Sequence, residues 1–113
     1  MNFAVLATQN ADGTVHQCVM WYAEDGKNLV MASKRYRRQC RNIAANPRVS
    51  VLIHDRDAPE RYVHVQGTAT LAADGARDLI ERLSLAYTGR PHGNPEDHER
   101  IVIRVTPETV TIR

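Results

Sequence analysis

The sequence predicts a mainly β fold of the α+β class, an antiparallel barrel that is closed or half-closed and carries two or more short helices. Six or seven short runs rich in β-branched and aromatic residues are separated by turn signals, as strands are. Only two segments have helical spacing, and no regular strand–helix alternation is present, which disfavours a parallel sheet. The length of 113 residues suits one domain with one core, so residues 1–113 are interpreted as a single domain.

The strands are expected to begin with a hairpin. Residues 3–8 and 15–23 flank the pair Asp12-Gly13, whose residue types favour a tight hairpin turn. A second turn at residues 24–28 precedes the third strand, and Thr106-Pro107-Glu108 separates the last two. The expected strands are 3–8, 15–23, 29–33, 49–55, 61–72, 100–105 and 109–113.

One helix is predicted over residues 74–89. Ala76, Leu79, Ile80, Leu83, Ala86 and Tyr87 recur at helical spacing. Asp74 is a candidate N-cap, and Gly89 is a residue of the type that ends helices.

The other helix is predicted within residues 32–47 and is strongly cationic. Lys34, Arg35, Arg37, Arg38 and Arg41 supply five of the fifteen basic residues of the chain within eight positions. Ser33 is the expected N-cap, and Asn46-Pro47 is expected to end the helix.

A helical wheel of residues 34–44 separates the charges from the apolar side chains. Lys34, Arg37, Arg38 and Arg41 fall within an arc of about a hundred degrees, while Tyr36, Cys40, Ile43 and Ala44 lie opposite.

No acidic residue stands between Asp25 and Asp55 to neutralise this cationic stripe. The positive charges, the Ser33 hydroxyl and the free N–H groups of a helix start favour a site for a phosphate. The alternative is a charged face that binds only water.

Other kinds of partner are disfavoured. The net charge of +2 and an aromatic content of 5% are low for a nucleic-acid binder. No run of eighteen apolar residues predicts a membrane span, and the start of the sequence lacks the features of a secretory signal. Cys18 and Cys40 form no metal or disulfide motif, so we expect them to be reduced, in a cytoplasmic protein.

No metal site is predicted either. His92 and His98 are accompanied by Glu96, Asp97 and Glu99, but their spacing is not that of a helical metal motif. Neither a P-loop nor a dinucleotide-binding fingerprint occurs in the chain.

Six motifs occur in an order typical of a known family. They are "FAVLATQNADGTVH", "VMWY", "RQCRNIAANPRVSV", "RYVHVQGTATL", "LAYTGRP" and "RIVIRVTPETV". With them the chain resembles the pyridoxamine 5'-phosphate oxidase-like split-barrel flavoproteins, especially the branch of deazaflavin (coenzyme F-420)-dependent oxidoreductases.

The resemblance implies a six-stranded split barrel and a homodimer that binds its cofactor, the deazaflavin or alternatively FMN, at the subunit interface. It implies that the cofactor phosphate lies on Ser33, Lys34, Arg35, Arg38 and Arg41, and that Met20 and Trp21 lie beside the ring. Gln39 replaces a lysine that relatives often carry, and Arg37 with Arg38 is expected to supply the lost charge. Two further departures are Val15 for a proline and Cys18-Val19 for Ser-Pro.

The implied activity is hydride transfer to a small unsaturated or carbonyl acceptor. The cofactor supplies the difficult step, so the chain needs few catalytic groups of its own. Tyr62, His64 and Tyr87 are the conceivable proton donors, and residues 88–99 are expected to form a surface loop or a lid. The alternative function is a flavin-, deazaflavin- or nucleotide-binding module without turnover.

Overall fold

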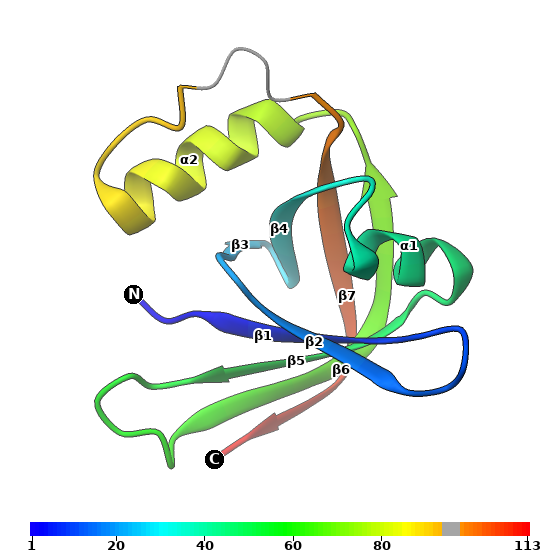
Figure 1. Ribbon diagram of the computed structural model, residues 1–113. Coiled ribbons are helices and arrows are strands. Elements are labelled where there is room, and N and C mark those ends of the chain that lie inside the picture. Colours follow the sequence, from blue (N-terminus) through cyan, green and yellow to red (C-terminus); the bar gives the residue numbers. More distant parts are fainter. Residues whose placement is uncertain (94–97) are drawn as a thin grey trace.

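The computed structural model describes residues 1–93 and 98–113 (Figure 1). The chain forms, in order, β1 (Ala4–Gln9), β2 (Val15–Met20), β3 (Ala23–Asp25), β4 (Asn28–Lys34), α1 (Arg38–Ala45), β5 (Arg48–His54), β6 (Tyr62–Ala72), α2 (Ala76–Thr88) and β7 (Arg100–Ile112). Within the described residues no helix is long and apolar enough to cross a membrane.

All of these strands belong to one antiparallel sheet, in the order β2-β1-β5-β6-β7-β4-β3. The mainly β prediction is confirmed, but the implied count of six strands is wrong, because the described residues form a sheet of seven. The sheet also does not close on itself: β2 and β3 are its two edges.

Most strand ends differ from the expected ones by a single residue, but in two places the strands are divided differently. The run 15–23 breaks at Trp21 and Tyr22, because β2 pairs with β1 whereas β3 pairs with β4 at the other edge of the sheet. The two expected strands after residue 99 are instead one continuous strand, β7, which pairs with both β4 and β6.

A β-bulge lets β7 continue through its proline. Gln66 pairs with Thr109 while the adjacent Gly67 pairs with Pro107, which leaves Glu108 as the extra residue. Proline is tolerated within sheets mainly at edges and bulges, since it has no N–H for the ladder.

Alternating residues of the strands build the core on one face of the sheet. The largest fully buried side chains are Leu6, Met31, Val51, Ile101, Ile103, Val105 and Cys40 of α1. A second, smaller cluster lies where α2 packs on β4 and β7, at the top of Figure 1. It contains Val30, Ala76, Leu79, Leu83 and Val102.

The helix predicted over residues 74–89 is confirmed as α2, and Gly89 ends it in the left-handed conformation. The N-cap position is held by Gly75, also left-handed, and not by Asp74 as expected. A positive φ suits glycine because it has no Cβ to clash with the backbone.

The cationic helix is shorter than predicted. α1 starts at Arg38, its N-cap residue is Arg37, and no side chain caps it, so the prediction of Ser33 as N-cap is wrong. Ser33 and Lys34 are instead the last residues of β4, because both pair with β7. Asn46 is the C-cap residue, as the Asn46-Pro47 pair predicts.

Tyr87 joins α2 to the start of the chain. Its hydroxyl donates to the backbone oxygen of Asn2 at 2.5 Å and accepts from the Tyr22 amide at 3.3 Å. Its ring stacks on Trp21 with centroids 5.3 Å apart and lies 5.4 Å from Phe3. The hydroxyl is therefore occupied by structural hydrogen bonds.

Replacing Tyr87 with phenylalanine is expected to lower the free energy of unfolding by about 1–2 kcal/mol, because it leaves a backbone donor and a backbone acceptor without their partner. Urea denaturation measures the change. Tyr36→Phe is the matched control: this side chain is 53% exposed, and we expect a change below about 0.5 kcal/mol. Equal effects of the two substitutions would contradict the structural role of the Tyr87 hydroxyl.

Candidate cofactor site

The basic residues of the segment lie in three local environments. Lys34 ends β4, Arg35 and Arg37 lie in the turn that follows, and Arg38 and Arg41 lie on α1. The turn is held by backbone hydrogen bonds from the Arg37 amide to Lys34 and from the Arg35 amide to Glu99. A single helical stripe of all these charges is therefore not formed.

The apolar side of α1 agrees only partly with the wheel. Cys40 and Ile43 are buried as predicted, with relative exposures of 1% and 3%. Tyr36 and Ala44, which were expected to pack inward, are exposed. Tyr36 precedes the helix, and its ring lies under the Arg37 guanidinium at 5.6 Å.

Ser33, near the end of β4, lies against the buried flank of α1. Its side chain is 5% exposed, and its hydroxyl accepts a hydrogen bond of 3.0 Å from the amide nitrogen of Gln39. The same nitrogen lies 3.9 Å from the sulfur of Met20. Ser33, Gln39 and Met20 thus form one polar contact between β4, α1 and the end of β2.

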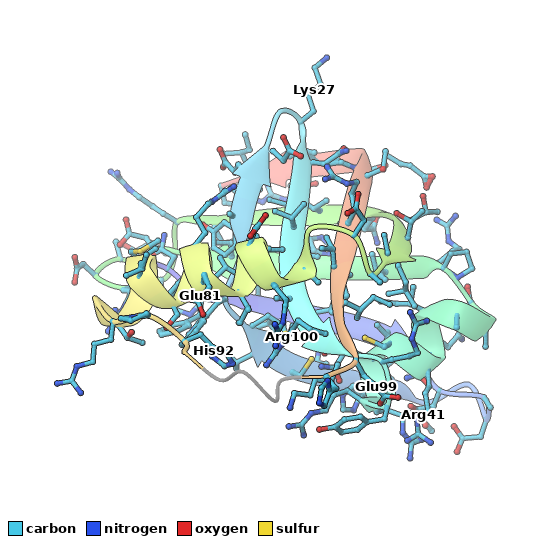
Figure 2. The ribbon with its side chains drawn as sticks, turned by 90° about the horizontal axis from the view of Figure 1, so that it is seen from above. Lys27, Arg41, Glu81, His92, Glu99 and Arg100 are labelled. Carbon is cyan, nitrogen blue, oxygen red and sulfur yellow. The ribbon has the colours of Figure 1, made fainter. Side chains whose placement is uncertain are left out.

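Arg38 and Arg41 belong to the exposed flank of α1. They line a hollow of about 510 Å³ between this helix and the turn of the β1–β2 hairpin. Figure 2 shows Arg41 projecting from the molecule at the end opposite Lys27. The other side chains around the hollow are mostly amides: Gln9, Asn10, Asn42 and Asn46.

Side-chain hydrogen bonds fix the walls of this hollow. Asn42 is 7% exposed and donates to Thr8 at 3.1 Å and to Asn10 at 2.9 Å. Asn46 donates to Gln9 at 2.8 Å. The helix and the hairpin are therefore tied together before any ligand binds, which lowers the entropy cost of binding.

The electrostatics of the hollow favour an anion. No ion pair to Arg38 or Arg41 occurs within residues 1–93 and 98–113. Asp12 lies at the hairpin turn, where hydrogen bonds from Thr14 lower its pKa, with a smaller contribution from the charge of Arg38. Among residues 1–93 and 98–113, this carboxylate is the acidic group that interacts electrostatically with Arg38, and it is already held by Thr14.

The structure thus separates residues that the sequence placed together. Successive helical residues are rotated by about 100°, so Gln39 with its partner Ser33 faces the core while Arg41 points almost oppositely. This arrangement does not support a single phosphate that is bound by both Ser33 and Arg41. The amides of Asn10, Asn42 and Asn46 were not anticipated, because no sequence spacing links the hairpin turn to α1.

The family profile of pyridoxamine 5'-phosphate oxidase matches residues 1–113, the whole chain. The chain belongs to the pyridoxamine 5'-phosphate oxidase family. A solved structure named "F420 Reductase" is 33% identical, with 97% of this chain and 89% of that chain covered and a TM-score of 0.88.

Other solved structures share the fold of this oxidase family at lower identity. General Stress Protein 26 from Bacillus anthracis is 26% identical, covers 98% of this chain and 83% of its own, and has a TM-score of 0.78. HutZ, the heme storage protein from Vibrio cholerae, is 16% identical over 97% and 84% of the two chains, with a TM-score of 0.77. No curated protein matches the chain.

Met20 and Trp21, the two residues expected beside the cofactor ring, pack against different clusters in this member of the pyridoxamine 5'-phosphate oxidase family. Met20 packs against the main core near Gln39, whereas Trp21 packs against the cluster under α2 and stacks on Tyr87. Met20 is therefore close to Ser33, and one face of Trp21 is already covered by another ring.

The candidate proton donors are Tyr62, His64 and Tyr87. Within the described residues, none of them forms a hydrogen bond with Ser33, whose hydroxyl is bonded to Gln39. Tyr62 and His64 project to the same face of β6, as predicted, and that face is the outer one, opposite the core residue Val65. The Tyr87 hydroxyl is bonded to Asn2. Burial raises the pKa of the Cys18 and Cys40 thiols, so both stay protonated at neutral pH.

The predicted loop or lid at residues 88–99 lies partly outside the described residues, which omit 94–97. Its first part is fixed by Glu81 of α2, whose carboxylate accepts from the amides of His92 and Gly93 at 3.0 and 2.9 Å (Figure 2). Within the described part of the chain, no three His, Cys, Asp or Glu side chains are grouped to hold a metal, and Glu96 and Asp97 fall in the omitted segment.

Proposed function

We propose that this chain is an oxidoreductase that binds a deazaflavin of the coenzyme F-420 type, or alternatively FMN, and passes a hydride to a small unsaturated or carbonyl acceptor. The observation that carries the proposal is the 33% identity to the structure named "F420 Reductase" over 97% of this chain. The hollow beside Arg38 and Arg41 supports it, because a phosphorylated cofactor needs an anion site.

The residues present suit an anionic ligand. Arg38 and Arg41 offer forked donors in a preformed hollow with amide walls. We propose that they hold the anionic tail, with Lys34, Arg35 and Arg37 adding positive charge along the neighbouring turn. Ser33 and Met20 would line the inner side of α1, next to the neutral amide of Gln39.

When bound, such a cofactor supplies the hydride, and the chain supplies binding, orientation and exclusion of water. Because Tyr87 is held by Asn2, and because Tyr62 and His64 lie on the outer face, the proton is expected to come from solvent. The chemistry then depends on how well the cofactor is positioned.

Parallel calorimetric titrations with FMN and with coenzyme F-420 test the cofactor, and we expect at least one dissociation constant below 1 mM. Reduced cofactor is then mixed with menadione or cyclohexenone, with and without the protein. Faster oxidation with the protein supports the oxidoreductase. Absence of binding by both cofactors would exclude the proposal.

The second candidate is a cofactor-binding module without turnover. It is favoured by the positions of the three candidate donors, none of which is free beside Ser33. A fold shared with a protein named for heme storage also shows that this architecture does not by itself imply catalysis. Tight binding without faster oxidation would select this function.

We further propose that the chain forms a homodimer. The supporting observation is that Val15 and Val19 of the edge strand β2 are 63% and 66% exposed. Sedimentation equilibrium measures the assembly, and Val19→Asp is expected to yield monomers because a charge would be buried. Leu85→Asp, at a site on α2 that is 53% exposed, is the control and should leave the dimer intact.

A further inference from the structure

The turn between β4 and α1 carries exposed positive charge that lies outside the hollow between α1 and the β1–β2 hairpin. Arg35, Tyr36 and Arg37 form this turn, and Arg38 begins α1 directly after it. All four side chains are exposed, but only Arg38 also lines the hollow. We call residues 35–38 the cationic turn.

An aromatic ring stands in the middle of the cationic turn. Tyr36 is 53% exposed, more than any other aromatic side chain of the described residues. The Arg37 guanidinium lies 5.6 Å from the centroid of its ring, and such a cation–π contact holds the two side chains together. Because about half of the tyrosine is still exposed, a second flat group can stack on the ring.

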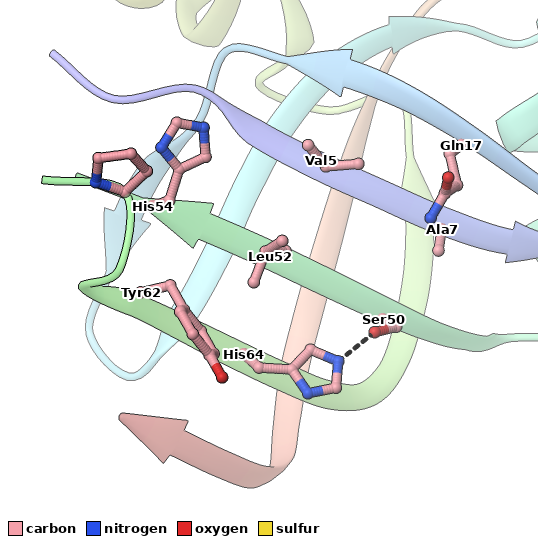
Figure 3. Close-up of a pocket in the computed structure, with 9 residues that line it drawn as sticks. Val5, Ala7, Gln17, Ser50, Leu52, His54, Tyr62 and His64 are labelled. Atoms are coloured by element: carbon pink, nitrogen blue, oxygen red, sulfur yellow. Dashed lines mark hydrogen bonds between the residues drawn. The ribbon is translucent and has the colours of Figure 1, made fainter. Parts of the chain in front are cut away.

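Other aromatic rings of the chain lie in different surroundings. Phe3 and Trp21 both pack on Tyr87. Tyr62 is half-buried on the outer face of β6, in a hollow that neither Lys nor Arg lines within the described part of the chain (Figure 3). The ring of Tyr36 thus differs from these in combining high exposure with several neighbouring cations.

The positive charge of the cationic turn is not neutralised by the chain itself. No ion pair to Arg35, Arg37 or Arg38 occurs within residues 1–93 and 98–113. Two carboxylates border the turn: Asp12 interacts with Arg38, and Glu99 accepts the Arg35 amide through its backbone oxygen at 2.9 Å (Figure 2). Three guanidinium groups therefore face two carboxylates that form no ion pair with them, and the excess charge suits a polyanion.

We propose that the cationic turn binds single-stranded nucleic acid. One base stacks on the ring of Tyr36, and the guanidinium groups of Arg35, Arg37 and Arg38 contact the phosphates on either side of it. Proteins that bind single strands combine these two features, a cationic path for the backbone and an aromatic ring for the bases. A low aromatic content counts against such a partner, but one exposed ring is enough for one stacked base.

This proposal does not depend on the proposed cofactor. Tyr36 does not line the hollow beside Arg38 and Arg41, and a phosphorylated cofactor needs no ring at the turn. The turn is also preformed, because the Arg37 amide donates to the Lys34 oxygen at 3.0 Å. Since Arg38 belongs to both surfaces, Tyr36 is the residue whose substitution separates them.

The test measures fluorescence anisotropy of labelled twelve-nucleotide strands, oligothymidylate and oligouridylate, with the intact chain and no added cofactor. We expect a dissociation constant below about 100 μM at about 50 mM KCl. The logarithm of the association constant should fall against the logarithm of the salt concentration with a slope of about −2, since each of three neutralised phosphates contributes about 0.7. Tighter binding of oligouridylate would assign the site to RNA, because only RNA carries the 2′-hydroxyl.

Variants separate stacking from charge. Tyr36→Ala should weaken binding of oligothymidylate about fivefold or more, whereas Tyr36→Phe keeps the ring and should stay within about twofold. A strand of the same length without bases should bind Tyr36→Ala and the unchanged chain equally. Arg37→Ala should reduce the steepness of the salt dependence by about 0.7. Arg82→Ala, on α2, is the control for charge and should leave the slope unchanged.

Several outcomes would overturn the proposal. They are absence of binding by both strands, an equal loss in Tyr36→Ala for strands with and without bases, or binding to phosphatidylserine vesicles but to neither strand. Calorimetric titration with FMN keeps this proposal apart from the proposed function, because Tyr36→Ala should leave the affinity for FMN within about twofold. Binding of FMN without binding of either strand would discard the nucleic-acid site alone.

Discussion

Replacing Gly67 with alanine is expected to lower the free energy of unfolding by about 3 kcal/mol or more. The added Cβ would overlap the carbonyl oxygen of Thr106 and would lie 3.0 Å from its carbonyl carbon and 3.1 Å from Cα of Pro107. All three neighbours are backbone atoms of β7. They cannot move away without disturbing the pairing of β6 with β7.

Chemical denaturation with urea measures this effect, and the matched control is Gly26→Ala. Gly26 has a positive φ of 61° but no atom within 4 Å of an added Cβ, so we expect a cost of only about 1–2 kcal/mol from backbone strain. A Gly67→Ala protein as stable as the Gly26→Ala protein would show that the bulge is not as tight as described.

Replacing both Arg38 and Arg41 with alanine is expected to weaken binding of the phosphorylated cofactor more than a hundredfold. Each single substitution should cost about 1.5–3 kcal/mol, or roughly ten- to a hundredfold in affinity, since a charge-assisted hydrogen bond is lost. Stability should change little because both side chains are exposed. Calorimetric titration with FMN and with coenzyme F-420 measures the affinities.

Arg82→Ala is the control for charge, because Arg82 is an exposed arginine on the other helix. It should leave affinity within about twofold, which allows for a small long-range electrostatic effect. A loss equal to that of Arg41→Ala would mean that only net charge matters, and would exclude a site at α1.

A further pair of variants decides which flank of α1 holds the anion. Gln39→Lys places a cation beside Ser33, and Ser33→Ala removes the hydroxyl that Gln39 contacts at 3.0 Å. If the anion lies beside Arg41, Ser33→Ala should leave affinity nearly unchanged. Tighter binding by Gln39→Lys together with weaker binding by Ser33→Ala would instead place the anion on the buried flank.

Much of the fold was predictable because local signals agree with the tertiary structure. The alternation in residues 3–8 and the Asp12-Gly13 turn correspond to β1 and its hairpin, and Gly89 ends α2 as its residue type suggests. Pro107 was misleading, because proline usually ends a strand. The bulge opposite Gly67 accommodates it without a break.

The candidate site was less predictable. A helical wheel that starts at Lys34 assumes that the helix starts there, whereas pairing of Ser33 and Lys34 with β7 delays the helix to Arg38. The wheel therefore grouped charges that lie on a strand, a turn and a helix. Only the pair Arg38 and Arg41 shares a face.

The sequence by itself determined the family, the β-rich class, the second helix and the local concentration of positive charge, because these depend on residue types and on contacts between near neighbours. Only the tertiary structure decided that Ser33 faces inward, that β7 is continuous and that the hairpin turn forms a wall of the arginine hollow. These features arise from pairing between segments far apart in the chain, which no local pattern encodes.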